Sequence, residues 1–280
     1  MKVLYAALLA SASALSAAAS AGWAPNVAVT ATWNSNATNA DRAFDEIGAL
    51  LLQADVDFFS TRISLGHDDA VFISGGIAME TWPRFEGLDR VALGPRLAWQ
   101  HKFGLGALAP VLRFEVSVDV VDARNEERSG LAGSGRLLWR QRLDESTQVT
   151  FSYERLRHHA RDALYNQTAG EAAAEISREL DERWTLGAKF RWRQGDVLSY
   201  ASPPRPDLVA LSRDRDTVDV FGKPLIAYSL DARSLGGSVS VTRSLDERTA
   251  LTFAYEGRIT ERSPLRYVNH LVSTAISRQF

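Results

Sequence analysis

The sequence has 280 residues, of which 32 are basic and 34 acidic, so its formal net charge at pH 7 is -2. This near-neutral balance gives no electrostatic case for nucleic-acid binding, and the absence of cysteine excludes disulfides and thiolate metal sites. Hydrophobic residues make up 45% of the chain, yet after the N-terminal leader no stretch approaches the roughly 18 consecutive apolar residues that a membrane helix needs.

The first 21 residues have the three parts of a secretory signal. Lys2 supplies a cation, an Ala-, Leu- and Ser-rich run follows, and Ala19-Ser20-Ala21 forms a small-residue cleavage site. We expect residues 1–21 to be a signal peptide that is cleaved after Ala21. The absence of cysteine near that site argues against a lipoprotein.

Alternating apolar and polar residues predict strands through the first half of the mature chain. These segments are 26–34, 49–65, 70–82, 91–103 and 112–120. The apolar parity of the second segment flips along its length, which predicts a β-bulge near residues 59–61. Trp33, at the end of the first segment, suits an interfacial aromatic girdle.

An internal repeat organises the second half. An L-D-E core recurs in residues 142–147, 179–184 and 244–249, and an alternating strand follows each copy. Because Asp favours turns by bonding nearby backbone, these copies predict short hairpin turns. The hairpin is therefore the expected building unit.

The spacing of turns and loops predicts twelve strands. Short turns near residues 66, 105, 144, 181 and 246 alternate with longer polar segments. Those longer segments are 35–48, 83–90, 122–130, 160–170, 196–227 and 260–266. The proline-rich segment 196–227 leaves two alternatives, an external hairpin above the membrane or a constriction folded inward.

The last stretch, 267–280, is an amphipathic strand that stops on Phe280. It resembles the final strand of Gram-negative outer-membrane β-barrel proteins, and the resemblance extends to the architecture of residues 22–280 without indicating a subfamily. It implies that Phe280 acts as an assembly signal for the barrel assembly machinery. The fold we expect is all-β, a transmembrane antiparallel up-and-down barrel, because only a closed sheet satisfies every backbone group in lipid. A soluble periplasmic β-sandwich is the alternative.

Charged residues on the inward rows of the predicted strands form the candidate lumen site. Lys189, Arg191 and Arg193 lie at period-two spacing on one face of one strand, and we expect them to pair with acids on the preceding strand. The full candidate set for lumen selectivity is Lys189, Arg191, Arg193, Arg136, Arg140, Arg113, Glu154, Glu175 and Glu179. The alternatives are a polar pore that orients a hydrophilic solute and a ladder of ion pairs that fills the lumen.

Catalysis has weak support in the sequence. The His-x-Ser-Asn-Gly type of motif that outer-membrane phospholipases carry is absent. His158 and His159 with Asp162 could supply a general base at the outer rim, but adjacent residues of a strand point to opposite faces and do not form a two-ligand metal site. We expect no enzyme activity, cofactor or metal.

We therefore predict an integral outer-membrane barrel that works as a passive, porin-like channel for small hydrophilic solutes. Its expected partners are outer-membrane lipid, the assembly machinery and that solute, with no nucleic acid. The alternatives are a closed barrel with a structural or surface-interaction role and, behind it, a hydrolase acting at the rim.

Overall fold

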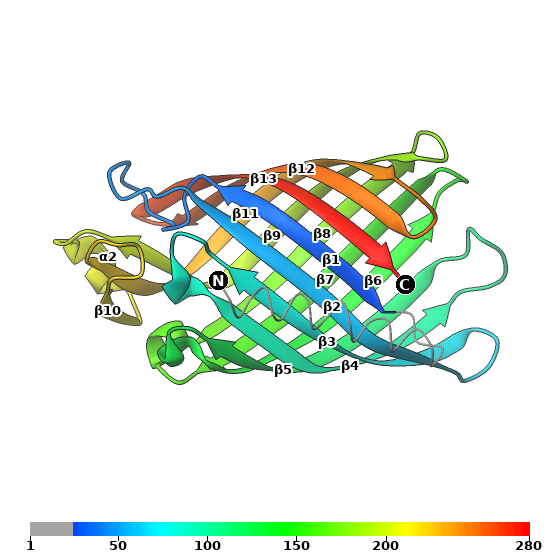
Figure 1. Ribbon diagram of the computed structural model, residues 1–280, viewed down its shortest axis with the longest axis horizontal. Coiled ribbons are helices and arrows are strands. Elements are labelled where there is room, and N and C mark those ends of the chain that lie inside the picture. The colour runs from blue at the N-terminus through cyan, green and yellow to red at the C-terminus, as the bar shows by residue number, and fades with distance from the viewer. Residues whose placement is uncertain (1–24) are drawn as a thin grey trace.

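A single antiparallel sheet that closes on itself forms the body of the protein, seen in a computed structural model that describes residues 25–280 (Figure 1). The predicted signal peptide and its cleavage site lie outside the described residues. The strands are β1 Asn26–Asn34, β2 Ala49–Ser64, β3 Asp69–Thr81, β4 Arg90–Lys102, β5 Val111–Ala123, β6 Gly130–Arg142, β7 Thr147–Ala160, β8 Gln167–Glu179, β9 Trp184–Ala201, β10 Asp214–Val218, β11 Leu225–Ser244, β12 Thr249–Arg262 and β13 Leu265–Gln279. Short helices are η2 Glu86–Leu88, η3 Glu126–Arg128, η4 Ala163–Tyr165 and α2 Pro206–Leu211.

Twelve of these strands make the barrel, as the sequence predicts. Each pairs with the next along the chain, β1 pairs with β13, and β9 pairs with β11, which closes the ring. The short strand β10 lies outside this ring and pairs only with residues 225–229 at the outer end of β11. The expected bulge in β2 is present, where the register shifts between Asp57 and Phe59.

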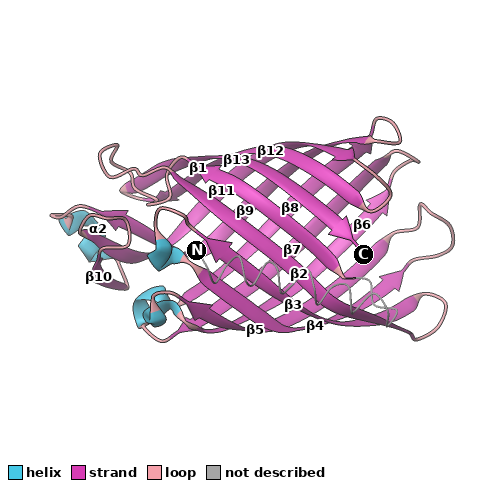
Figure 2. Ribbon diagram, viewed as in Figure 1, coloured by secondary structure: helices cyan, strands magenta, loops and turns pink. Residues whose placement is uncertain are grey.

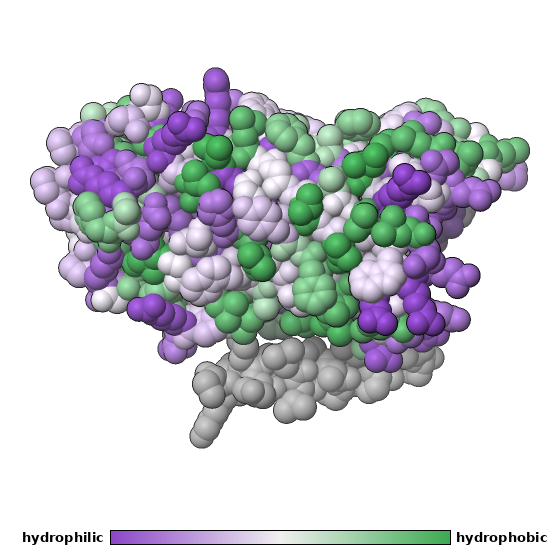
Figure 3. All heavy atoms as spheres, turned by 90° about the horizontal axis from the view of Figure 1, so that it is seen from above, coloured by the Kyte–Doolittle hydropathy of each residue, from purple (hydrophilic) through white to green (hydrophobic). Residues whose placement is uncertain are grey.

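The barrel carries its apolar residues on the outside. Along β5, Phe114, Val116, Val118 and Val120 are exposed, while the alternate residues face the lumen. Apolar side chains spread over the middle of the molecule in Figure 3, and hydrophilic ones gather toward its two ends. Eleven of the barrel strands have 13 or more residues, which exceeds the roughly 9–11 that a tilted strand needs to cross a bilayer.

The described helices are short, with three to six residues each. Among residues 25–280, no helix is long and apolar enough to cross a membrane.

The two ends of the barrel differ. Short turns join the strands at one end, and at the other the connections are longer and include η2, η3, η4, α2 and β10 (Figure 2). In barrels of this type, short turns face the periplasm and long loops face outside. We call the long-loop end the outer end and the other the inner end.

The three L-D-E copies form equivalent turns at the inner end. Asp144 Oδ1 accepts hydrogen bonds from the backbone N–H groups of Ser146 (2.8 Å) and Thr147 (2.7 Å). Asp181 and Asp246 accept in the same way from the residue two positions on. Backbone hydrogen bonds to Asp144 and Asp246 lower the pKa of both carboxyl groups, that from Ser146 contributing most to Asp144.

Asp144→Ala is expected to lower the urea midpoint of barrel unfolding, because the turn loses the acceptor for two N–H groups. The effect requires an ionised carboxylate. A lowered folded-state pKa stabilises the fold above the unfolded-state pKa, and this contribution is lost as the pH falls. Glu145→Ala is the matched control, since Glu145 forms no hydrogen bond or ion pair with residues 25–280. Equal midpoints for the two variants would contradict this assignment.

Candidate functional site

A lid formed by residues 196–232 covers the outer end of the lumen. Residues 196–201 of β9 and 226–232 of β11 continue past the ring, paired with each other after their other neighbours have ended. The pairing of β9 with β8 ends at Gly195, whose φ is +141°. A Cβ at Gly195 would lie 2.2 Å from the carbonyl oxygen of Thr168, so only glycine allows β8 and β9 to approach this closely.

Loop 1, residues 35–48 between β1 and β2, covers the free edge of the lid. The N–H of Tyr200 donates to Thr38 O (2.9 Å), Asn39 Nδ2 donates to Leu198 O (2.9 Å), and Ser199 Oγ donates to Asn39 O (2.8 Å). These contacts satisfy backbone groups that the end of β8 leaves without a strand partner.

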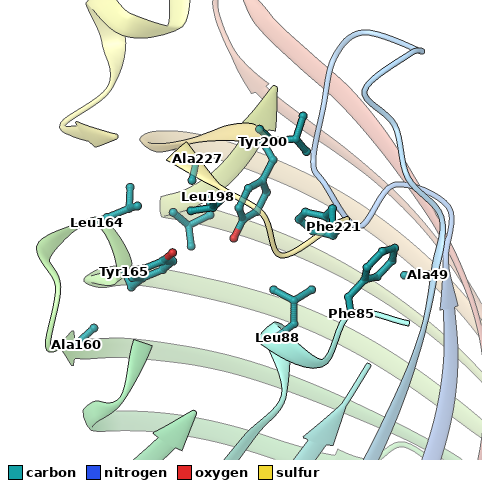
Figure 4. Packing of buried hydrophobic residues seen from close by; sticks show 12 residues of the cluster. Ala49, Phe85, Leu88, Ala160, Leu164, Tyr165, Leu198, Tyr200, Phe221 and Ala227 are labelled. Atoms are coloured by element: carbon teal, nitrogen blue, oxygen red, sulfur yellow. The ribbon is translucent and has the colours of Figure 1, made fainter. Parts of the chain in front are cut away.

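Apolar side chains join the lid to the opposite side of the rim. The Phe221 ring lies between Tyr200 and Phe85, with centroids 4.9 and 5.0 Å away (Figure 4). Phe85 belongs to the β3–β4 connection, which is half the ring away from the lid in the strand order. Leu88 from η2 and Leu164 from η4 complete this buried cluster. The segment 196–227 thus forms an external extension of the hairpin that also folds inward across the mouth.

A buried arginine ties loop 1 to the lid. Arg205, whose side chain is 1% exposed, donates to both carboxylate oxygens of Asp41 (2.6 and 2.9 Å) and to Asp207 (2.7 Å). Hydrogen bonds from Arg205 lower the pKa of Asp207 to about 2. The hydrogen bonds that Arg205 donates to Asp207 and then to Asp41 raise the pKa of its guanidinium, so this group stays charged.

Beneath the lid lies a cavity of about 240 Å³, which we call the outer-lumen cavity. Leu88, Leu198, Tyr200 and Phe221 border it from the lid and rim. Its polar lining comes from the barrel strands and loops: Asn39, Glu80, Arg90, Arg128, Gln167, Arg193, Asp196, Ser234, Arg258, Thr260, Tyr267 and Asn269.

The predicted basic stripe on β9 faces the lumen, but its three members have different partners. Lys189 lies opposite Glu175 on β8 in the strand register, but the two side chains form no ion pair within 4 Å. Arg191 instead pairs with Glu256 on β12 at 3.1 Å. It reaches over β11 at Gly236, where a Cβ would lie 3.0 Å from Arg191 Cγ. The expectation that Arg191 pairs with the preceding strand is therefore wrong, because a glycine opens a route to the following strands.

Arg193, the third member, borders the outer-lumen cavity. Its Nη2 donates to the backbone oxygen of Asp196 at 3.1 Å. No carboxylate oxygen of residues 25–280 lies within 4 Å of its guanidinium.

The other predicted lumen residues lie toward the middle and inner end. Arg113 pairs with Glu115 at 2.8 Å and lines a second cavity of about 260 Å³ together with Arg136 and Arg140. Glu154 lies opposite Arg136 in the register of β6 and β7. Glu179 is 3.6 Å from Arg142.

The opposite wall of the lumen carries small side chains. The inward rows of β11, β12, β13 and β1 are made largely of Ser, Thr, Ala and Gly, including Ser238, Ser240, Thr252, Ala254, Ser273, Ala275, Ala28 and Thr30. The charged rows of β4 to β9 face this wall, which itself carries the Glu256–Arg258 ion pair on β12. One side of the lumen is therefore rich in charge, and the other is rich in small and hydroxyl side chains apart from that pair.

The rim residues considered for catalysis do not assemble into a catalytic unit. Asp162 Oδ1 accepts from the N–H of Leu164 at 2.8 Å and caps η4. Within residues 25–280, neither His158 nor His159 forms a hydrogen bond with a carboxylate, and no cluster of three potential metal ligands occurs.

Phe280 follows the last residue of β13. Its N–H donates to Pro25 O at 3.0 Å, and the guanidinium of Arg278 lies 5.1 Å from the centre of its ring. Its proposed part in assembly stays a prediction.

Sequence reasoning missed much of the outer-lumen cavity. Arg128 lies in a loop, and Asn269 and Tyr267 lie on a strand assigned only to barrel closure. The alternation of residues along the strand was the one sequence signal for Asn269 and Tyr267, because it places both on the inward row of β13. Nothing local indicated that a loop arginine would reach the same cavity.

No protein-family model and no curated protein matches the sequence. Among solved structures, an outer membrane channel from Pseudomonas putida F1 superposes with a TM-score of 0.60 at 9% identity, over 92% of this chain and 96% of that one. The NanC porin gives 0.48 at 6% identity, over 91% and 100%. The KdgM porin, solved in complex with disordered oligogalacturonate, gives 0.46 at 7%, over 91% and 99%. At such identities the similarity concerns the fold and not the solute.

The closed sheet and the apolar exterior define the class of fold, and the superposition on the Pseudomonas putida F1 channel agrees with it. The chain has the fold of an outer-membrane β-barrel, with twelve barrel strands. The structure and the comparisons assign no subfamily within that class.

Arg205→Met is expected to loosen the lid, because two carboxylates lose a buried partner. The cost is on the order of 2 kcal/mol, below that of a fully buried pair because both carboxylates are partly exposed. Chymotrypsin cleavage within residues 196–232 should then become roughly thirtyfold faster, since cleavage tracks the open population. Arg266→Met removes an exposed ion pair with Glu261 and should leave the rate unchanged. Equal rates for both variants would show that Arg205 does not hold the lid.

The same contact predicts how the lid responds to acid. Because the pKa of Asp207 is held at about 2, its contribution is complete above the ordinary carboxyl value of about 4 and is lost as the pH falls toward 2. Pepsin cleavage of the lid, corrected for enzyme activity on an unfolded substrate, should rise over that interval in the wild type. It should already be high at pH 4 in Arg205→Met.

Proposed function

We propose that this protein is a passive channel for small hydrophilic solutes, gated at its outer end by the lid. The observation that carries the proposal is the lumen itself, where charged rows face a wall of small hydroxyl and methyl side chains. Such a wall leaves space next to polar groups, which is what a diffusive pore requires. Pore size and lumen charge determine what passes, and the proposed mechanism needs no covalent chemistry.

The lid makes the gate part of the proposal. Phe221, Phe85 and Tyr200 are buried together above the outer-lumen cavity, so a solute crossing the mouth has to separate them. The contact is apolar and lacks ion pairs, and its strength is set by the area that it buries. Opening therefore depends on this contact, while Arg205 still holds loop 1 to the lid.

Planar-bilayer recordings test the channel and the gate together. The folded wild-type protein is expected to give a salt-proportional current with closures. Phe221→Ala should favour the open state by on the order of 3 kcal/mol, the lower end of the cost of truncating a buried Phe, which is roughly a hundredfold in the closed-to-open ratio. Val209→Ala, on the exposed side of α2, should leave gating unchanged. Silence from the wild type and Phe221→Ala, with both confirmed as folded barrels, would rule out the channel.

Ion selectivity tests the part played by the basic stripe. Arg193→Gln is expected to shift the reversal potential toward cation preference more than Arg191→Gln does. The reason is that the charge of Arg191 is already balanced by Glu256, whereas Arg193 has no carboxylate within 4 Å among the described residues. Arg155→Gln removes the same charge from the outward row of β7 and should have little effect. If all three variants matched the wild type, the stripe would not set selectivity.

The lid also favours a second candidate, a barrel that stays closed and serves as a structural or surface-interaction protein. In that case the lid would be permanent, and Phe221→Ala would lower stability without producing current. The recordings described above separate the two functions.

A further inference from the structure

Two guanidiniums at the outer-lumen cavity have no carboxylate partner within the described part of the chain, although other charges around them are paired. Arg90 forms a two-point ion pair with Glu80 (2.6 and 2.8 Å), and Arg258 pairs with Glu256 (2.8 Å). Arg128 and Arg193 have no carboxylate oxygen of residues 25–280 within 4 Å. The residues that line the cavity therefore carry more positive than negative charge, and Glu171, which lies opposite Arg193 in the register of β8 and β9, forms no ion pair with it within 4 Å.

The cavity's own acids are already engaged. Glu80 is held by Arg90. Asp196 Oδ1 lies 2.6 Å from Arg213 Nη1 in an ion pair without hydrogen-bond geometry, and its Oδ2 accepts from the N–H of Thr168 at 2.7 Å. Neither carboxylate is available to neutralise Arg128 or Arg193 without losing a buried or bidentate contact.

Each of the two arginines also has N–H donors that form no hydrogen bond within residues 25–280. Arg128 Nη1 donates to Gly87 O at 3.3 Å, and Arg193 Nη2 donates to Asp196 O at 3.1 Å. A guanidinium has five N–H donors in a planar fork that matches a carboxylate. One backbone contact each leaves both forks with unused donors at the edge of the same cavity.

Asn269 adds an acceptor to the cavity wall. Asn269 is 2% exposed, and its Oδ1 accepts no hydrogen bond from residues 25–280. Its Nδ2 donates to Asn36 O (2.6 Å), Asn34 Oδ1 (3.1 Å) and Asn39 Oδ1 (3.3 Å), and these acceptors fix the orientation of the amide. A buried acceptor without a donor is costly. Because this oxygen has less than 1 Å² of accessible surface, the side chain has to turn toward the cavity before a ligand hydroxyl can donate to it.

The remaining walls suit a small, partly flat molecule. Tyr200, Phe221 and Trp82 border the cavity, and Gln167 contributes an amide. At about 30 Å³ for each water molecule, a volume of about 240 Å³ holds roughly eight waters. It therefore accepts one small organic molecule and excludes a polymer.

We propose that the outer-lumen cavity is a binding site for a small hydroxylated carboxylate, with the size of a single sugar acid. Arg128 and Arg193 hold the carboxylate, the Oδ1 of Asn269 accepts a hydroxyl, and the aromatic side chains contact the apolar face of the molecule. The site rests on the proposed channel function and names its solute class, and it lies under the lid on the path that the solute takes.

Titration calorimetry on the full folded protein in detergent tests the site, with D-glucuronate as the probe and D-glucose as its uncharged counterpart. Glucuronate is expected to bind, and glucose to bind at least roughly tenfold more weakly, because it lacks the charge that the two forks recognise. Arg128→Gln and Arg193→Gln should each weaken glucuronate roughly tenfold or more, and the double variant should abolish detectable binding.

Arg155→Gln is the matched control, since it removes the same charge from the outward row of β7 and should leave glucuronate affinity unchanged. Arg128→Lys and Arg193→Lys keep the positive charge without the planar guanidinium, so we expect intermediate affinities for glucuronate. Such a result would show that the weaker binding of the Gln variants does not come from misfolding. Equal binding of glucose and glucuronate, wild-type affinity in both single Gln variants, or binding of inorganic phosphate as tightly as glucuronate would each overturn the proposal.

The same variants separate this inference from the channel function. A wild type that conducts but does not bind glucuronate leaves the channel standing and removes the site. A wild type that binds glucuronate with the expected dependence on Arg128 and Arg193, but carries no current, keeps the site and removes the channel.

Discussion

Backbone hydrogen bonding inside a hydrocarbon layer is the constraint on which this structure depends. An unpaired N–H or C=O in lipid costs several kcal/mol, so the sheet has to close, and it does so where β1 meets β13 and β9 meets β11. The constraint ends at the outer rim. Beyond it β9 and β11 continue without β8 and β12, and loop 1 supplies the partners that neighbouring strands no longer provide.

This change of environment at the rim explains the lid. Inside the membrane, apolar residues face outward and polar ones face inward. Past Gly195 both faces of β9 are buried, with Leu198 and Tyr200 on one side and Val197 and Ala201 on the other. In the barrel, β9 therefore has one apolar face toward lipid and one polar face toward the lumen. Beyond Gly195 both of its faces are buried, as in the core of a water-soluble protein. Apolar side chains thus lie above a polar lumen.

Much of the barrel could be predicted from the sequence because period-two alternation is a local signal. The bounds of β1, the bulge in β2 and the three Asp turns depend on residues that are close along the chain. The lid could not be derived in this way, because the contact between Phe221 and Phe85 joins loops half a ring apart. Arg191 shows the same limit within a strand, since its partner depends on Gly236, a residue whose effect comes from the side chain that it lacks. The cavity combines both kinds of information, as Arg193 was visible in an alternating row and Arg128 was not.

Arg205 has a mechanical consequence for the rim. Through Asp41 it joins loop 1 to the lid, although the two are rooted a third of the ring apart. The joined segments form one arch with two feet, at β1–β2 and at β9–β11. Because loop 1 and the lid are attached to the barrel at two places, the joined segments cannot rotate freely about either one. They can lift only on the side of the rim where neither is attached. In the proposed gating, the aperture lies beside Phe85, along the edge formed by β4 to β7, where the charged wall of the lumen begins.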